Sequence, residues 1–318
     1  MAATSRMADI SAPPSVRQIG VKAQRCLTSP GFSGRVIAAG NSAVYIATDD
    51  GELLAACPMD AQPHPRSFLT DLNLSLFQEG LRAWAEEGEL YFSNGISLYL
   101  GEGEAWFRSS AVPPCVAPFP VFCSRVGDLL DAALNAHAGE NLGLALPLFS
   151  HGDNSPLLEE NISPLIIAGV QTVHELLPVC RLGDLQPVLK LSEQLIGLGP
   201  GLTPSGDDCV GGLIFMARHL KAAYPQEDWW RGGDAGGFLI RSKAMTSWIS
   251  HVLLADLAEG QSHESLHDLA EALVADSEKF DAAFHVRRVT AIGHSSGWDI
   301  LTGMLAGLLP VIHRLSRS

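Results

Sequence analysis

The segment VPPCVAPFP, residues 112–120, places four prolines within nine positions. Proline has no backbone N–H and a fixed φ angle, so a regular helix cannot continue through this segment. Before it, short runs rich in aromatic and β-branched residues are separated by turn residues; after it, apolar residues recur at helical spacing, as in Val126, Leu129 and Leu130. The segment therefore predicts a connector between two lobes, with the boundary near residue 118.

The N-terminal lobe, residues 15–118, is predicted to consist mainly of β-strands. In the run GRVIAAGNSAVYIATDDGELLAA, turn residues separate apolar, β-rich stretches. A second run, ELYFSNGISLYL, has the hairpin dipeptide Asn94-Gly95 at its centre. We predict a meander or barrel-like sheet, preceded by a short helix around Val16–Leu27.

The C-terminal lobe, residues 119–318, is predicted to be mainly helical. Its clearest pattern spans Phe238–Glu259, where an apolar stripe and a polar stripe that includes Lys243 both follow the helical period. The sequence thus predicts an α+β fold in which a β-rich lobe precedes a helical lobe.

The composition indicates a chain with a sizeable core and an acidic surface. Hydrophobic residues make up 47% of the 318 positions. Thirty-five acidic residues against 21 basic ones give a formal charge of −14, which repels phosphate backbones and argues against nucleic-acid binding. Only 18% of the residues are charged and the mean hydropathy is +0.16, so we expect part of the surface to be covered in an oligomer or complex.

The N-terminus and the cysteines bear on location. The six cysteines are scattered without a C-x-x-C pair, and residues 1–14 lack the apolar core of a secretory signal. We therefore expect a polar, flexible tail over residues 1–14 and a reducing, cytoplasmic setting. The longest apolar stretch, Ile300–Ile312, is too short to span a bilayer, so no membrane segment is predicted.

The most informative stretch is GLGPGLTPSGDD, residues 197–208, which leads into the apolar run CVGGLIFMARHL. Its glycines and prolines predict a sharply turning loop before a helix, and glycine lets backbone N–H groups approach a ligand closely. The free N–H groups at the start of that helix favour an anion. The candidate ligand contacts in this loop are Gly199, Gly201, Thr203, Ser205 and Gly206.

Asp207 and Asp208 follow the last glycine, where the common phosphate-binding loop has a lysine, and the G-x-G-x-x-G pattern fails at Leu202. Three interpretations of these aspartates stay open. They cap the helix, they ligate a Mg²⁺ ion that carries a phosphate, or they act as a base and an orienting group in catalysis. No other cofactor is predicted.

A second loop, IGHSSGWDILTG at residues 292–303, repeats this design. Both loops contain S-G-x-D-x-x-x-G, which aligns Asp299 with Asp208. Two helix starts of one design predict one pocket for a small ligand with two polar ends. The candidate contacts in this loop are Ser295, Ser296, Gly297 and Asp299. Four glycines in the two helices are expected to let them pack closely: Gly211, Gly212, Gly303 and Gly307.

Two familiar motifs are interpreted as coincidental. Gly293–Gly297 fits G-x-S-x-G, but the acid and histidine that a serine hydrolase needs later in the chain are poorly placed. His263–His267 fits H-E-x-x-H, yet no third zinc ligand is evident and Ser262 is typical of a helix cap. We expect an exposed helix turn at the second motif.

The two loops resemble a family of bacterial proteins grouped with AllH, a subunit of oxamate carbamoyltransferase from anaerobic allantoin breakdown. GLGPGLTPSGDD and IGHSSGWDILTG carry the resemblance, and TSWIS at residues 246–250 is similar in style. The resemblance covers the C-terminal half, whereas the N-terminal lobe is similar only in layout and in the run GRVIAAGNSAVYIAT.

This resemblance implies phosphorolysis of oxalurate to oxamate and carbamoyl phosphate, or the reverse, in a complex with an FdrA-like subunit and a second large subunit. Acyl transfer to phosphate needs a phosphate cradle, donors for the developing oxyanion and an acid for the leaving amide. The loop N–H groups with Thr203 and Ser205 are candidates for the first two. His294 is the candidate for proton transfer, and Asp207 or Asp208 for orientation or metal binding.

Two alternatives to this reading remain. The chain is a non-catalytic assembly subunit whose glycine loops only pack helices or dock another subunit, or it is a related acyl- or phosphoryl-transfer enzyme with another small substrate.

Overall fold

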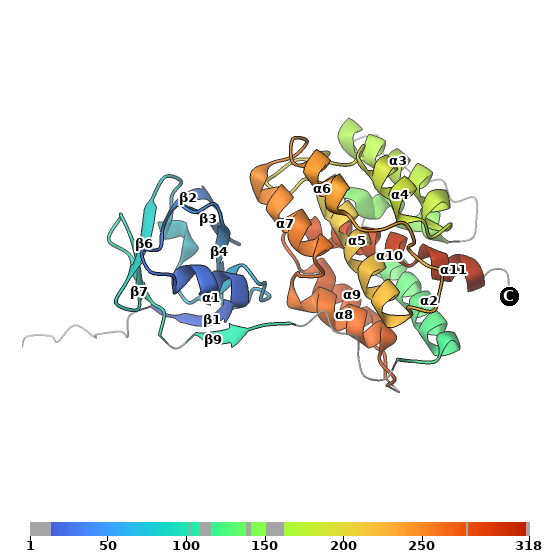
Figure 1. Ribbon diagram of the computed structural model, residues 1–318, viewed down its shortest axis with the longest axis horizontal. Coiled ribbons are helices and arrows are strands. Elements are labelled where there is room, and N and C mark those ends of the chain that lie inside the picture. Colours follow the sequence, from blue (N-terminus) through green and yellow to red (C-terminus); the bar gives the residue numbers. More distant parts are fainter. Residues whose placement is uncertain are drawn as a thin grey trace, which may run out of the picture. The chain divides into compact units, whose positions relative to one another are not determined.

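The computed structural model describes residues 14–101, 103–108, 116–137, 141–150, 162–277 and 279–315. Its internal contacts divide the chain into two units, one ending at Phe107 and the other beginning at Arg108 (Figure 1). Residues 1–13 of the predicted tail, and residues 109–115 around the first prolines of the predicted connector, lie outside the described residues.

The first unit is a curled sheet with the strand order β8-β7-β6-β2-β3-β4-β5-β1-β9 (Figure 1). Helix α1 (Val21–Leu27) and the short 3₁₀ helix η1 (Leu74–Leu76) complete it. The strands are β1 (Val16–Gly20), β2 (Ser33–Ala39), β3 (Val44–Thr48), β4 (Leu53–Pro58), β5 (Ser67–Thr70), β6 (Arg82–Glu86), β7 (Glu89–Phe92), β8 (Ser97–Tyr99) and β9 (Glu104–Trp106).

Neighbouring strands of this sheet are antiparallel except in the pairs β4–β5 and β1–β9. Alternate apolar side chains such as Val36, Ile46 and Leu54 are fully buried in one core, as the period of two predicts. At Asn94-Gly95 the glycine has a φ angle of 87°, which suits the tight turn between β7 and β8.

The helix predicted over Val16–Leu27 is wrong in its first part. Val16–Gly20 is strand β1, which pairs with β5 on one side and β9 on the other, and only Val21–Leu27 is helical. Pairing with two strands that are distant in sequence outweighs the local helical pattern, a cause that sequence periodicity does not contain.

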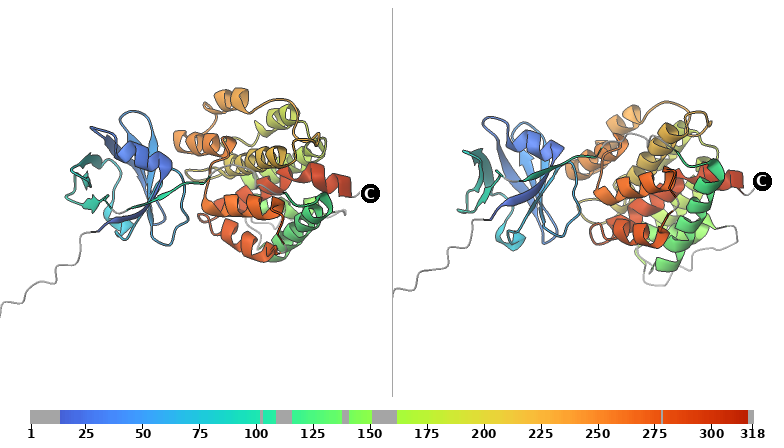
Figure 2. Two further views of the ribbon diagram at one scale, coloured as in Figure 1. Left: turned by 60° about the horizontal axis from the view of Figure 1, so that its bottom comes forward. Right: turned by 90° about the horizontal axis from the view of Figure 1, so that it is seen from below.

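The second unit is helical, so the predicted α+β fold with a β-rich lobe before a helical lobe is confirmed (Figure 2). It also contains the 3₁₀ segment η2 (Asn141–Phe149). The helices are α2 (Phe119–Ala136), α3 (Pro164–Cys180), α4 (Leu185–Ser192), α5 (Ser205–Ala223), α6 (Gly236–Ser242), α7 (Trp248–Ala258), α8 (Glu264–Val274), α9 (Ala282–Thr290), α10 (Ser296–Gly307) and α11 (Leu309–Leu315).

Helices α5 and α10 make the most extensive helix contact of this unit. A Cβ atom on Gly303 would lie 1.8 Å from the carbonyl oxygen of Cys209, and one on Gly212 would lie 2.2 Å from that of Ile300. The two helices therefore touch backbone to backbone at two matched points, a distance that only glycine permits. Gly307 also lies against α5, whereas Gly211 packs against leucines of α7.

The single helix predicted over Phe238–Glu259 is interrupted. Helix α6 ends at Ser242 and α7 begins at Trp248. The Ser247 hydroxyl accepts a hydrogen bond from the Ser250 N–H at 3.1 Å, which caps α7. Because Thr246 in this break donates to Asp207, the interruption serves the first glycine loop.

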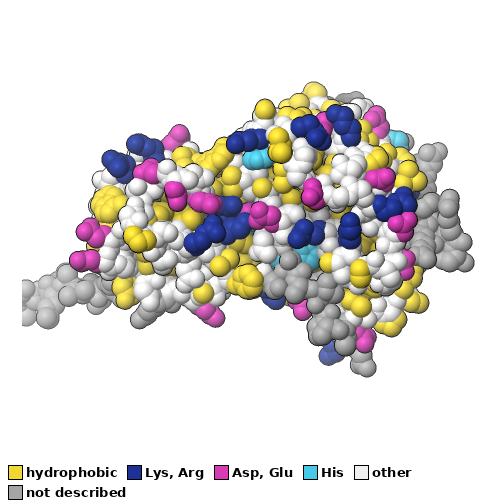
Figure 3. All heavy atoms as spheres, viewed as in Figure 1, with side chains coloured by type: hydrophobic (Ala, Val, Ile, Leu, Met, Phe, Trp, Pro, Cys, Tyr) yellow, Lys and Arg dark blue, Asp and Glu magenta, His cyan; other side chains and the backbone are white. Residues whose placement is uncertain are grey.

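The described cysteines, Cys26, Cys57, Cys123, Cys180 and Cys209, are free thiols. In the part of the chain that the structure describes, each helix is either too short or too polar to cross a bilayer. On the face shown in Figure 3, Lys and Arg side chains are interspersed with Asp and Glu rather than gathered into one patch.

Candidate functional site

The first glycine loop, residues 197–208, folds back on the start of α5. Gly197, Gly199 and Gly201 have φ angles of 77°, 125° and 94°, which residues with a Cβ rarely adopt. The loop is closed by a hydrogen bond of 2.9 Å from the Gly206 N–H to the Leu198 carbonyl. The predicted sharp turn before a helix is thus present, and it depends on these glycines.

The second loop, residues 292–303, closes in the same way. The Gly297 N–H donates to the Ile292 carbonyl at 3.0 Å, and Gly293 has a φ angle of 59°. A Cβ atom on Gly297 would lie 2.3 Å from the Val289 carbonyl oxygen, much as one on Gly206 would meet the Leu195 carbonyl oxygen at 1.8 Å. The repeated sequence pattern therefore corresponds to a repeated backbone arrangement.

The two loops meet. The hydroxyl oxygens of Thr203 in the first loop and Ser296 in the second lie 3.2 Å apart, although 93 residues separate them in the chain. The Asp208 carboxyl group lies close to both hydroxyls. The structure therefore brings the two sequence motifs to one place, with a carboxyl group and two hydroxyls where they join.

The Asp208 carboxyl group is unusual in its surroundings. Its residue is only 8% exposed, and its Oδ2 atom accepts no hydrogen bond from the described residues. Burial raises its pKa well above the usual range, and the nearby carboxylates of Asp299 and Asp207 raise it further, while the Ser296 and Thr203 hydroxyls act in the opposite direction. These surroundings therefore favour the protonated carboxylic acid of Asp208 over its carboxylate.

The backbone amides of the loops divide into two groups. Those of Gly206 and Gly297 close the loops, and those of Asp207 and Asp208 donate to Pro204. A second group donates no hydrogen bond to any described residue. Its members are the amides of Gly199, Gly201, Leu202, Thr203 and Ser205 in the first loop and of Gly293, His294, Ser295 and Ser296 in the second. Both loops thus present backbone N–H donors that have no partner among the described residues.

Asp207 holds the site together. Its Oδ1 atom accepts from the Gly197 N–H at 2.6 Å, and its Oδ2 atom accepts from the hydroxyls of Thr246 and of Ser250, the latter at 2.5 Å. The carboxylate is 2% exposed and fully engaged with protein donors. These contacts join the loop to the start of α7, so the residue has a structural task that sequence reasoning did not assign.

The predicted Mg²⁺ ligation by Asp207 and Asp208 fits these surroundings poorly. Both Asp207 oxygens already accept protein hydrogen bonds, which leaves Asp208 as the one carboxyl group of the pair with a free oxygen. Within the described residues, no group of three or more His, Cys, Asp or Glu side chains is arranged to hold a metal ion. We therefore assign no chemical step to a metal at this place.

Replacing Asp207 by alanine is expected to lower the free energy of unfolding by about 3 kcal/mol, because three donors lose a buried, charged acceptor. Urea denaturation of the full chain measures this. The control is Asp131→Ala on the exposed face of α2, which is expected to change stability by less than about 0.5 kcal/mol. Equal stability of the two variants would contradict the role given to Asp207.

The other two predicted residues of the second loop differ in their positions. Asp299 is 1% exposed, and its Oδ1 atom accepts from the Leu142 N–H at 2.9 Å, which fixes the loop to η2. His294 is exposed and makes no hydrogen bond to the described part of the chain. Its imidazole is thus free to move, unlike the carboxyl of Asp208.

The expectation of an exposed turn at His263–His267 is wrong. His267 is 4% exposed, its Nε2 atom accepts from the Ser262 N–H at 3.2 Å, and burial lowers its pKa to about 4. Burial likewise lowers the pKa of His263 to about 4. His267 therefore belongs to the packed interior of α8, whereas His263, which precedes the helix, is partly exposed.

Sequence reasoning missed the residues that hold the loops from outside. Thr246 and Ser250 lie four residues apart in the polar stripe of Phe238–Glu259. This spacing is the sequence signal that their two hydroxyls can face one common partner, which is Asp207. Leu142 contributes only its backbone N–H, which leaves no trace in the sequence.

The fold and site define a two-unit α+β protein whose helical unit presents two glycine loops of one design at adjacent helix starts. The model of the family described as "Oxamate carbamoyltransferase subunit AllH" matches residues 195–308. That span contains both loops and the segment between them, and the match confirms the resemblance to AllH there. No solved structure matches the chain.

Proposed function

We propose that this chain is a subunit of an oxamate carbamoyltransferase-like enzyme and that its paired glycine loops bind the small anionic substrates. The match to AllH over residues 195–308 supports the first part, since the family description names a subunit of that enzyme. The reaction is the phosphorolysis of oxalurate to oxamate and carbamoyl phosphate, or its reverse.

The observation that carries the proposal is the buried, unpartnered Oδ2 atom of Asp208 at the junction of the loops. A buried polar atom without a partner is costly unless a ligand satisfies it. The hydroxyls of Thr203 and Ser296 lie close to it, and so do the carboxyl groups of Asp207 and Asp299. Together with a protonated Asp208, these hydroxyls and the loop amides that have no partner among the described residues form a donor set that suits phosphate, carbamoyl phosphate and the carboxylates of oxalurate and oxamate.

The chemistry needs one proton donor. A phosphate oxygen attacks the carbamoyl carbon of oxalurate, the bond from that carbon to the amide nitrogen breaks, and oxamate leaves. Asp208, whose raised pKa favours the protonated acid, gives its proton to the departing nitrogen, and the phosphate proton restores it. The loop amides stabilise the oxyanion that forms at the carbamoyl group. Asp208 thereby takes the role first expected of His294.

The proposed setting is a cytoplasmic complex with an FdrA-like subunit and a second large subunit. Two large apolar side chains are exposed near the loops. Leu202 in the first loop is 47% exposed, and Trp248 at the start of α7 is 38% exposed. The Ser247 hydroxyl donates to the Leu202 carbonyl at 2.9 Å, so the start of α7 lies against the first loop, and we propose that these two exposed side chains form one surface there. Covering it would also exclude water from the reacting groups.

The direct test is calorimetric titration of the full chain with inorganic phosphate and with carbamoyl phosphate. Binding is expected for both, and the double variant Thr203→Val with Ser296→Ala is expected to weaken it at least about tenfold, since each lost hydroxyl removes one hydrogen bond. Thr172→Val on α3, which removes a hydroxyl bonded within its own helix, is the control.

The assembly alternative has its own supporting observation, the backbone contact between α5 and α10 through Gly212 and Gly303. That contact explains two of the glycines without any ligand. The same titration separates the two functions. Absence of heat and of a thermal shift with either anion would favour the assembly subunit.

A further inference from the structure

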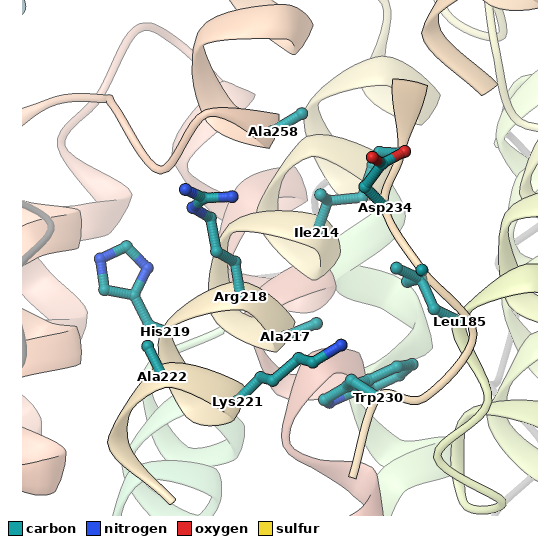
Figure 4. A pocket seen from close by; sticks show the side chains of 12 residues that line it. Leu185, Ile214, Ala217, Arg218, His219, Lys221, Ala222, Trp230, Asp234 and Ala258 are labelled. Carbon is teal, nitrogen blue, oxygen red and sulfur yellow. The ribbon is translucent and has the colours of Figure 1, made fainter. Parts of the chain in front are cut away.

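A cavity of about 350 Å³ lies in the helical unit, away from the glycine loops (Figure 4). One side of the cavity is formed by a single face of α5. Its residues follow the helical spacing: Ile214, Ala217, Arg218, Lys221 and Ala222. The other lining residues come from the start of α4, the segment before α6 and the end of α7: Leu185, Trp230, Gly233, Asp234, Ala235 and Ala258, with His219 at the edge.

The wall opposite α5 is fixed by hydrogen bonds. Trp230 has a φ angle of 55°, rare for a residue with a side chain, and its Nε1–H donates to the Gly307 carbonyl at 2.9 Å. Arg231 exchanges backbone hydrogen bonds of 2.9 Å with Gly183 and Leu185. The cavity is therefore formed before any ligand arrives, which lowers the entropy that binding would otherwise lose.

The cavity carries positive charge in an acidic chain. Arg218 and Lys221 extend from successive turns of α5, and neither forms an ion pair with any residue that the structure describes (Figure 4). Asp234 is the opposing charge, and its Oδ1 atom already accepts from the Gly236 N–H at 2.9 Å. Burial lowers the pKa of His219, so this imidazole adds no charge at neutral pH. Two cations thus face one partly engaged carboxylate.

This cavity is separate from the site between the loops. Asp208 and Lys221 both lie on α5, thirteen residues apart, which corresponds to roughly 20 Å along a helix axis. One phosphate or carboxylate group therefore cannot contact both Asp208 and Lys221, and none of the lining residues belongs to either glycine loop. A ligand here would be additional to the substrates proposed above.

We infer that this cavity binds a small organic anion whose phosphate or carboxylate group pairs with Arg218 and Lys221. Figure 4 shows the Arg218 guanidinium and the Lys221 ammonium pointing in different directions. Both residues are exposed, so their long side chains can turn toward one anionic group and bind it with charge-assisted hydrogen bonds. Leu185 and Ile214 offer apolar contact to the body of the ligand, and Asp234 accepts a hydrogen bond from an N–H group at its far end. An inorganic ion fills only a small part of this volume, so an organic anion is the better fit.

The test uses AMP as an organic phosphate and hippurate as a carboxylate, each with an N–H donor, in calorimetric titrations of the full chain. At least one of them is expected to bind with a Kd below about 1 mM, and its neutral counterpart, adenosine or hippuramide, at least about tenfold more weakly. The double variant Arg218→Ala with Lys221→Ala is expected to lose at least tenfold in affinity for the anion that binds.

Arg287→Ala on α9 is the matched control, because Arg287 is also exposed and makes no ion pair with the described residues. It is expected to bind the anion as the unaltered chain does. Tighter binding of AMP would indicate that the cavity prefers a phosphate group, and tighter binding of hippurate that it prefers a carboxylate. Failure of both anions to bind, equal binding of the neutral counterpart, or full affinity in the double variant would overturn the inference.

Discussion

Replacing Asp208 by asparagine is expected to reduce turnover of the reconstituted complex at least about hundredfold, the usual contribution of a positioned proton donor. Asparagine has the same shape and no charge, so it fits the space of the neutral acid but has no acidic proton to give. The measurement is the rate of carbamoyl phosphate formation from oxalurate and phosphate. Asp131→Asn on α2 is the control and is expected to leave the rate unchanged.

The same variant has a distinctive stability profile. The raised pKa of Asp208 means that the folded protein keeps the proton while the unfolded chain releases it above its ordinary pKa of about 4. Stability from this residue is therefore fully present below that pH and declines as the pH rises toward the raised value. Asp208→Asn removes the decline, so urea denaturation should show a variant at least as stable as the unaltered chain at pH 8.

Two outcomes would remove Asp208 from the mechanism. One is unchanged turnover in Asp208→Asn together with a large loss in His294→Ala, which would return proton transfer to the exposed imidazole. The other is a loss of turnover accompanied by unfolding, since a proton donor whose removal spares the fold must give a folded, inactive variant.

Gly303→Ala is expected to destabilise the helical unit by about 3 kcal/mol or more, the upper range for overpacking. The new Cβ atom would lie 1.8 Å from the Cys209 carbonyl oxygen, and no side chain can turn aside because backbone meets backbone. The two helices would have to separate along their whole contact. Urea denaturation measures the effect.

Gly127→Ala is the matched control for this substitution. Gly127 is also within a helix, α2, but a Cβ atom there meets no atom within 4 Å. Alanine should stabilise the chain by about 0.5–1 kcal/mol at such a position, because it favours the helix. A similar change in both variants would show that the contact between α5 and α10 is not as tight as described.

The division into a β-rich and a helical part could be predicted because each follows from a local period. The secondary structure was predicted less well where contacts with distant parts of the chain determine it. Val16–Gly20 is recruited as a strand by β5 and β9, and the predicted helix over Phe238–Glu259 is broken so that Thr246 reaches Asp207. In both cases the deciding partner lies many residues away in the chain.

The part of the candidate site that could be predicted is the pair of loops, because both carry the same sequence pattern. The shared S-G-x-D-x-x-x-G pattern indicated that the loops meet, and the contact between Thr203 and Ser296 agrees with this expectation. The difference between the adjacent aspartates was not predictable. Both residues lie on the first turn of α5, but their side chains meet different neighbours. Asp207 accepts hydrogen bonds from three donors, whereas Oδ2 of Asp208 accepts none.

The reciprocal contact of Gly212 and Gly303 also bears on how the site responds to its ligand. These glycines lie only four residues from Asp208 and Asp299, so the first turns of the two helices cannot slide or rotate independently. An incoming anion would meet a rigid receptor, with little closing motion left to perform. Most of the selectivity would then come from the fixed spacing between the loops.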